Sequence, residues 1–275
     1  MAAPDWLGAA RRAADALREM LARRPTIAER VLETGTRGKG GDRTLEIDAA
    51  AEEAVFAELE ALHRAGARFT VVSEERGWVE YGSDQLRVVV DPIDGSVNAK
   101  RGLPHHALSI AVAEGDTMAD VVFAYVRDFS PPEEWVGRRG QGAWLDGGRL
   151  DPALGDRRTR DGRLEVIGVE SADPRWVRDS ADALADSAHR LRALGAIAVS
   201  LCQVAAARFD GMATLKNCRA VDAAAAQLIV REGGGLVAFT AYEDPLGAPL
   251  DLEPHSPVVA ARTPAGLAEM RLLPS

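Results

Sequence analysis

Residues 91–96 (DPIDGS) bring together the residue types of this chain that are best suited to chemistry. Pro92 fixes its own φ and cannot continue a central strand, so we expect the chain to turn there. Gly95 permits an unusual dihedral angle or a close approach to a ligand. Asp91 and Asp94 on such a turn could point into one cavity, where they would repel each other unless a cation neutralised them. Their hard oxygen atoms suit magnesium or calcium.

DPIDGS is also good turn chemistry, because aspartate and glycine favour tight turns, and taken alone it leaves both interpretations open. An EF-hand loop is excluded, because the twelfth position counted from Asp91 is Gly102 rather than a glutamate. A nucleophilic-aspartate phosphatase would need two aspartates separated by one residue, whereas Pro92 and Ile93 both intervene here.

Further carboxylates stand beside predicted secondary structure. The β-like run at residues 69–72 leads to Glu74, and the run at 88–90 leads to DPIDGS. Ligands of α/β proteins usually collect outside strand ends, so this placement favours a functional site. N-capping of alanine-rich helices would by itself explain two more carboxylates, Asp48 and Asp222.

Four segments in order, together spanning residues 44–235, make the chain resemble the inositol monophosphatase family. This family belongs to a larger superfamily of lithium-sensitive, magnesium-dependent phosphatases. The segments are Thr44-x-x-x-Asp48, Ser73-Glu74-Glu75, DPIDGS with Asn98, and Val221-Asp222 through Gly234-Gly235. Gly140-x-Gly142 is a weaker match, whereas the third and fourth segments are highly specific.

The resemblance implies a phosphatase that binds two magnesium ions, with a third bound more weakly near Asp48. The first ion would be held by Glu74, Asp91 and the backbone carbonyl of Ile93. The second would be held by Asp91, Asp94 and Asp222. Two such ions about 3.5–4 Å apart can activate water, bridge phosphate oxygens and stabilise the leaving alkoxide.

The resemblance also implies which groups prepare the attacking water: Asp48, Glu74 and the hydroxyl of Ser96. Ser96 stands where the family has a threonine, and a serine hydroxyl can make the same hydrogen bond. Backbone N–H groups of Gly95 and Ser96 would bind the phosphate if a helix begins there. His105 and His106 are interpreted as structural.

The family includes enzymes for several phosphate esters, and residues 217–227 together with DPIDGS are more similar to the archaeal-type dual inositol monophosphatase/fructose 1,6-bisphosphatase group. We therefore expect inositol monophosphate, fructose 1,6-bisphosphate or both as the small phosphorylated substrate. The alternatives are a nucleoside 3',5'-bisphosphate, a nicotinamide-nucleotide phosphate, or a non-catalytic relative that only binds a metal or ligand. Three cations could bind a second phosphate or only balance the charge of the acidic site: Arg192, Lys216 and Arg219.

Helical spacing of apolar residues predicts helices at residues 7–24, 48–62, 176–188, 196–209, 222–232 and 264–270. Strands are expected at 69–72, 88–90, 164–169, 191–194, 211–215, 235–239 and 257–261, with β-rich stretches at 107–127 and 135–150. Residues 35–42 form a predicted mobile loop and a candidate lid. The resemblance implies a layered α-β-α-β-α sandwich. Its α+β lobe would comprise residues 1–155 and its α/β lobe, with Asp222, residues 156–275, commonly in a homodimer.

The 275-residue chain has 42 acidic and 33 basic residues and a net charge of −9, which argues against nucleic-acid binding. Its two cysteines, Cys202 and Cys218, indicate a reducing compartment rather than a disulfide scaffold. Residues 1–24 lack the apolar core of a signal peptide, and no window approaches the ~18 apolar residues of a membrane span. We therefore expect a cytoplasmic protein without a membrane partner.

Overall fold

The computed structural model describes residues 4–30, 32–37 and 43–273. Apolar β runs in the first half of the chain form a seven-stranded sheet, here called the large sheet, in the order β3-β4-β5-β6-β7-β8-β9. Its strands are β3 (Phe69–Ser73), β4 (Gly77–Asp94), β5 (Ala107–Ala113), β6 (Val121–Phe129), β7 (Pro132–Arg138), β8 (Gly142–Leu145) and β9 (Gly148–Arg149). A 3-10 turn, η1 (Met118–Asp120), precedes β6.

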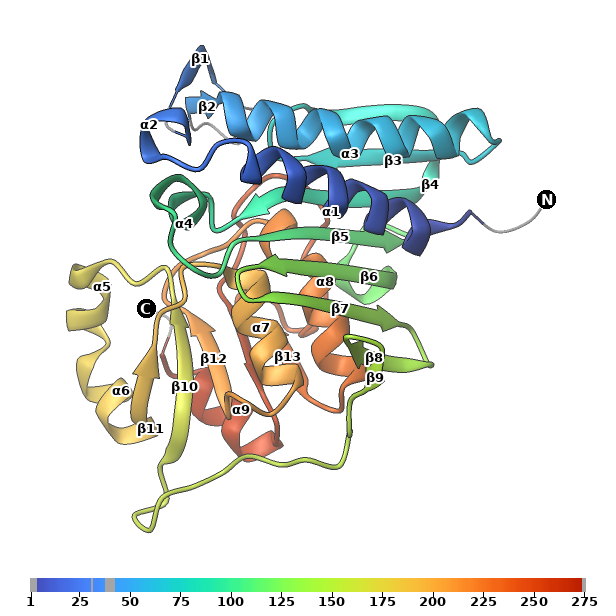
Figure 1. Cartoon of the computed structure of the whole chain (residues 1–275). Coiled ribbons are helices and arrows are strands. Elements are labelled where there is room, and N and C mark those ends of the chain that lie inside the picture. Colours follow the sequence, from blue (N-terminus) through green and yellow to red (C-terminus); the bar gives the residue numbers. More distant parts are fainter. Residues whose placement is uncertain (1–3, 31, 38–42, 274–275) are drawn as a thin grey trace.

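β4 passes β3 twice. In its first part Gly77 lies opposite Ser73, and in its second part Val90 lies opposite the same residue, so β3 has a stretch of β4 on each side. This arrangement buries all five residues of β3 and places the loop after Ser73 beside the end of β4. The C-terminal ends of β3 and β4 therefore lie at the same end of the large sheet (Figure 1).

The second half of the chain forms a five-stranded small sheet in the order β11-β10-β12-β14-β13. β10 runs parallel to β11 and β12, whereas β14 runs antiparallel to β12 and β13. The strands are β10 (Leu164–Glu170), β11 (Ala188–Arg192), β12 (Gly211–Thr214), β13 (Leu236–Phe239) and β14 (Val258–Ala261).

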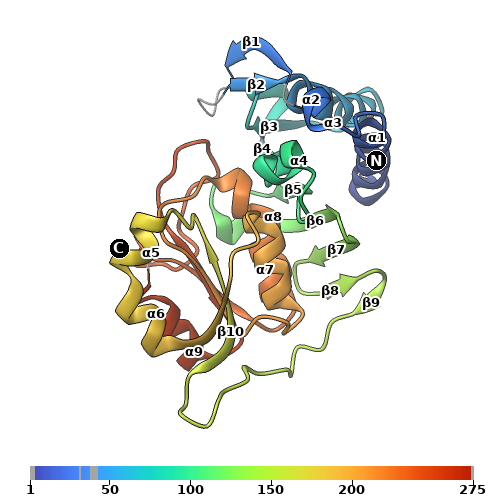
Figure 2. The same cartoon turned by 60° about the vertical axis from the view of Figure 1, so that its left-hand side comes forward.

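Helices cover both sheets and fill the space between them (Figures 1 and 2). α1 (Trp6–Ala22) and α3 (Glu46–Arg64) share one apolar core with the large sheet, and α5 (Pro174–Asp179), α6 (Ala181–Ser187) and α9 (Pro264–Met270) flank the small sheet. α7 (Ile197–Ala205) and α8 (Ala220–Glu232) lie between the sheets, so α8 is buried at every position from Ala220 to Val230, on all its faces. The expected α-β-α-β-α sandwich is confirmed.

Four short elements complete the chain: α2 (Ile27–Arg30), α4 (Ser96–Arg101), β1 (Glu33–Arg37) and β2 (Arg43–Leu45). β1 corrects part of the predicted loop, because residues 35–37 belong to a strand that pairs with β2. The rest of that loop and candidate lid, residues 38–42, lies outside the described residues. In the described part of the chain, none of the helices is long and apolar enough to cross a membrane.

Several predicted boundaries were wrong by a few residues. The helix expected at 176–188 is two helices, because Ser180 leaves the helical conformation and its hydroxyl donates to the carbonyl of Leu273. β11 ends at Arg192, whereas a strand was expected at 191–194. α3 and α8 each begin two residues early, so Asp48 and Asp222 lie in the first helical turn rather than at the N-cap. The proposed boundary between residues 155 and 156 falls between β9 and β10 and stays a prediction.

Candidate active site

A small hollow opens where the start of α3, the loop after β3 and the end of β4 meet. It is lined by Asp48, Glu74, Glu75, Pro92, Ile93, Ser96 and Lys100. Four of these residues were predicted for the site from the sequence: Asp48, Glu74, Ile93 and Ser96. Here we call this hollow the acidic pocket.

The DPIDGS segment forms a bulge at the end of β4 rather than the turn expected at Pro92. Asp91 pairs with Ser109 and Asp94 with Ala107, so two residues on β4 oppose one on β5. One oxygen of Asp91 accepts the N–H of Ile93 at 2.9 Å, which fixes the bulge from within. The bulge accommodates Pro92, which has no N–H for the ladder.

Asp91 and Asp94 are both buried at this bulge. Burial, together with the negative charges of Glu74, Asp94 and Asp222, raises the pKa of Asp91 well above its ordinary value. Burial and Asp222 likewise raise the pKa of Asp94. Four predicted ligands, brought from β4, the β3 loop and α8, therefore act on one another electrostatically.

Glu74 and Asp222 face a common cation, Arg219. Nη1 of Arg219 lies 2.8 Å from Oε1 of Glu74, and Nη2 lies 3.3 Å from Oδ1 of Asp222. Burial and the neighbouring Asp222 raise the pKa of Glu74 to about 7, although Arg219 opposes this rise. The pKa of Arg219 is itself raised, because the carboxylates of Asp222, Glu74 and Asp91 outweigh its burial.

Asp94 also holds the start of α7. Its two oxygens accept the N–H groups of Ile197 at 3.1 Å and Ala198 at 2.8 Å, where the helix has no side-chain N-cap of its own. Next to it, Gly95 has φ of 81°, and a Cβ there would lie 2.8 Å from the carbonyl oxygen of His105. Both the positive φ and the close approach therefore require glycine, as the sequence predicts. The expected helix also begins at Ser96.

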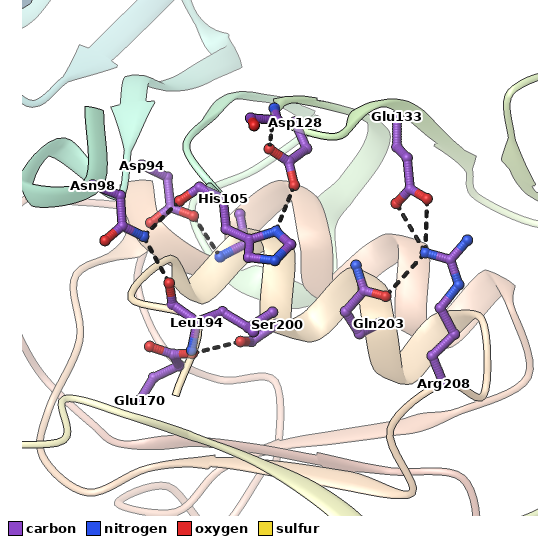
Figure 3. A network of polar contacts seen from close by, with 12 residues as sticks. Asp94, Asn98, His105, Asp128, Glu133, Glu170, Leu194, Ser200, Gln203 and Arg208 are labelled. Atoms are coloured by element: carbon purple, nitrogen blue, oxygen red, sulfur yellow. Dashed lines mark hydrogen bonds and ion pairs between the residues drawn. The ribbon is translucent and has the colours of Figure 1, made fainter. Parts of the chain in front are cut away.

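Figure 3 shows a polar network that sequence reasoning missed. The amide of Asn98 donates to the carbonyls of His105 and Leu194, at 2.8 and 2.7 Å. Buried Glu170 accepts from the N–H groups of Leu194 and Gly195 and from the hydroxyl of Ser200. The network fixes residues 194–195 against α4, and no local sequence pattern marks Glu170 for this position.

His105 and His106 have the structural surroundings expected of them. Nδ1 of His105 lies 2.9 Å from the buried carboxylate of Asp128, which also accepts the N–H of Ser130. His106 is buried, and burial lowers its pKa.

Glu52 is a second residue that sequence reasoning missed. It lies one helical turn after Asp48 on α3, buried, and accepts hydrogen bonds from the hydroxyl of Ser73 and the N–H of Arg76. It therefore holds both ends of the loop that carries Glu74. Its spacing of four residues from Asp48 is the signal that could have found it.

The three candidate phosphate-binding cations do not lie together. Arg192 is exposed on β11 and donates to the carbonyl of Leu191, 2.8 Å away. Lys216 lies with its Nζ 5.6 Å from the ring centroid of Trp176. Arg219 contacts two of the predicted ligands, Glu74 and Asp222.

The donor set fits a hard divalent cation, because Asp91 interacts electrostatically with the carboxylates of Glu74, Asp94 and Asp222, and two of the predicted donors, Glu74 and Ile93, line the acidic pocket. Within the described ranges, no three histidine, cysteine or carboxylate side chains already stand as a metal cluster. The guanidinium of Arg219 lies between two of the predicted ligands, Glu74 and Asp222.

The chain is similar to proteins of one known family. The model of the inositol monophosphatase family matches residues 5–272. The chain is 35% identical over 201 residues to the fructose-1,6-bisphosphatase/inositol-1-monophosphatase of Thermococcus kodakarensis, covering 72% of this chain and 70% of that protein. It is 33% identical over 208 residues to the Nus factor SuhB of Pasteurella multocida, with 71% of each covered.

Solved structures share the fold. The extragenic suppressor protein SuhB of Bartonella henselae superimposes with a TM-score of 0.75 at 26% identity, over 97% of this chain and 96% of that one. An inositol monophosphatase–fructose 1,6-bisphosphatase structure reaches a TM-score of 0.79 at 23% identity, over 98% and 99%. The chain therefore belongs to the inositol monophosphatase family, and it is a phosphatase.

Proposed function

We propose that this phosphatase hydrolyses a small phosphate monoester, inositol monophosphate or fructose 1,6-bisphosphate or both, with magnesium at the acidic pocket. The observation that carries the proposal is the burial of Asp91 and Asp94 close to the carboxylates of Glu74 and Asp222, which together with burial raise the pKa of Asp91. Such crowding of buried negative charge costs stability unless a cation binds there. Relatives named as fructose-1,6-bisphosphatase/inositol-1-monophosphatase support this substrate class.

Glu74, Asp91, Asp94, Asp222 and the carbonyl of Ile93 would hold the magnesium. When bound, Mg²⁺ supplies positive charge for the phosphate oxygens and lowers the pKa of a coordinated water. Asp48 and Ser96 both line the pocket, where the hydroxyl of Ser96 would orient the attacking water and the carboxylate of Asp48 would accept its proton. Gly95 and Ser96 at the start of α4 would position the phosphate.

Phosphate release from inositol 1-phosphate and from fructose 1,6-bisphosphate, each with and without magnesium, tests this proposal. We expect turnover of at least one ester that stops when EDTA removes the metal. A nucleoside 3',5'-bisphosphate and a nicotinamide-nucleotide phosphate serve as the competing substrates. Faster turnover of either would reject the substrate class, and equal rates with and without metal would reject the magnesium site.

A second phosphate of fructose 1,6-bisphosphate needs cations beyond the metal site, and Arg192 and Lys216 are the other two candidate cations besides Arg219. Replacing each by glutamine should raise KM for the bisphosphate and leave KM for inositol 1-phosphate unchanged. Equal effects on both substrates would limit these cations to charge balance.

The expected homodimer is part of the same proposal. β11 is an edge strand of the small sheet in the described chain, and its Leu191 is exposed, as are Val97 and Leu103 in and after α4. Light scattering of the purified protein tests for a mass of twice 29.3 kDa. The expectation that the chain binds no nucleic acid stays a prediction, since several relatives are named Nus factor SuhB.

A further inference from the structure

Arg219 immediately precedes α8 and turns its side chain back toward the acidic pocket. Its backbone N–H donates to Oδ2 of Asp222 at 2.9 Å, so the residue is anchored to the first turn of the helix. From this anchor its guanidinium spans Glu74 and Asp222, which come from the loop after β3 and from α8. Arg219 thus connects Glu74 and Asp222, which are 148 positions apart in the sequence.

The contacts of Arg219 are of the kind that a metal would make. Its side chain is four-fifths buried, and it acts electrostatically on Asp91 as well as on its two direct partners. Arginine forms strong charge-assisted hydrogen bonds to carboxylates through a planar fork of donors. Because Oε1 of Glu74 and Oδ1 of Asp222 already face the guanidinium, another cation at these oxygens would be repelled by the fixed positive charge of Arg219.

We propose that Arg219 is a tethered cation that competes with magnesium: it neutralises the acidic pocket when no metal is bound, and it must leave Glu74 for a metal to bind. The inference rests on the proposed function, because it takes the acidic pocket as the magnesium site. Two cations that need the same carboxylate oxygens exclude each other, so Arg219 lowers the affinity of the site for magnesium. Its contacts to Glu74 and Asp222 also stabilise the metal-free protein.

Isothermal titration of metal-free protein with magnesium chloride measures this competition without any substrate. We expect R219Q to bind magnesium more tightly than the wild type, by roughly 5- to 150-fold, the usual range for coupling between two binding events. R231Q is the matched control, because Arg231 lies on the same α8 and its side chain contacts Gln227 instead. R231Q should bind magnesium as the wild type does.

R219K separates competition from simple charge. Lysine keeps the positive charge but is a point charge without the planar fork, so it cannot bridge Glu74 and Asp222 as arginine does. Competition predicts an affinity for R219K between those of the wild type and R219Q. An R219K affinity equal to that of the wild type would mean that only charge matters and would overturn the inference.

Thermal unfolding gives an independent readout. Without metal, R219Q should unfold at a lower temperature than the wild type, and magnesium should raise its midpoint by more than it raises that of the wild type. Equal magnesium shifts in the two proteins would also reject the inference. If neither the wild type nor any variant binds magnesium, the failure belongs to the proposed metal site rather than to the role of Arg219.

Discussion

Asp94, at the end of β4, accepts a 2.8 Å hydrogen bond from the backbone N–H of Ala198 at the start of α7. With Ile197 on its other oxygen, this carboxylate links the large sheet to the helix layer between the sheets. Because both oxygens are already oriented by the protein, a cation at Asp94 would meet a preorganised ligand. The proposed metal site is thus built into the packing of α7.

We predict that D94N lowers kcat/KM by more than the roughly 10- to 100-fold that outer partners of metal sites contribute. Asparagine has one acceptor oxygen and no charge, so it loses one helix contact and the attraction for the metal. The matched control is D210N, because Asp210 also accepts two backbone N–H groups, from Arg157 and Val166, away from the acidic pocket. Steady-state phosphate release should fall in D94N only; full activity of D94N would refute the site.

A second prediction concerns Glu52, which holds the loop that carries Glu74. E52A removes the acceptor for Ser73 and Arg76, and the loop should lose its fixed position. We expect the magnesium concentration for half-maximal activity to rise by roughly 10- to 100-fold, while kcat at saturating magnesium falls less. E58A is the control, since Glu58 on α3 pairs with Arg12, whose side chain is exposed. An unchanged magnesium requirement in E52A would show that the loop is held by other contacts.

The pH dependence of stability follows from the pKa of Glu74, which is raised from 4.5 to about 7 mainly by burial. A carboxyl with a raised pKa binds its proton more tightly in the folded state, so the free energy of unfolding falls as pH rises from about 4.5 to about 7. Asp91 and Asp94 act in the same direction, because their pKa values are also raised.

We therefore predict that metal-free protein in EDTA has a melting temperature that decreases between pH 5.5 and 7.5. E74Q should show a weaker decrease, because glutamine does not titrate, and each pKa unit removed corresponds to about 1.4 kcal/mol. E80Q, at an exposed position of β4, is the control. Differential scanning calorimetry across this range checks the slopes; parallel slopes for E74Q and the wild type would contradict the assignment.

The parts of the site that depend on local chemistry were predictable from the sequence. Pro92 fixes its own φ and Gly95 permits an unusual dihedral angle, so a distortion of the strand and a close approach could be inferred without knowing the fold. The form of the distortion was not predictable, because the bulge depends on pairing with β5, a separate strand. The helix beginning at Ser96 was likewise expected and found.

The contacts that position these residues were not predictable, because they join distant parts of the chain. Glu52 meets Ser73 across 21 positions, and Glu170 meets Ser200 across 30. The sequence around a single glutamate does not indicate such a distant partner, since isolated glutamates are usually solvated. Arg219 was expected either to bind a second phosphate or to balance the charge of the acidic site, and its bonds to Glu74 and Asp222 depend on how α8 approaches the β3 loop.

The guanidinium of Arg262 is also held by residues far away in the sequence. Arg262 is buried, and within the described residues its hydrogen bonds go to backbone carbonyls rather than to acidic side chains. Its guanidinium donates to the carbonyls of Ala205 and Gly233, at the C-terminal ends of α7 and α8, and to that of Leu154. A cation at two helix C-termini satisfies carbonyls that have no partner within the helix and opposes their partial negative charge. The residue therefore fixes the far ends of the two helices whose near ends carry the proposed site.

We predict that R262M lowers the free energy of unfolding by about 3 kcal/mol, because it keeps the apolar stem but leaves buried carbonyls unsatisfied. R158M is the control: Arg158 is more exposed and pairs with Asp156 and Glu269, so its loss should cost less than about 1 kcal/mol. Urea unfolding followed by circular dichroism measures both. Because Arg262 lies at the opposite ends of α7 and α8 from Asp94 and Asp222, kcat of folded R262M should stay near that of the wild type. A loss of kcat with unchanged stability would mean that the helix ends act on the chemistry rather than on the fold.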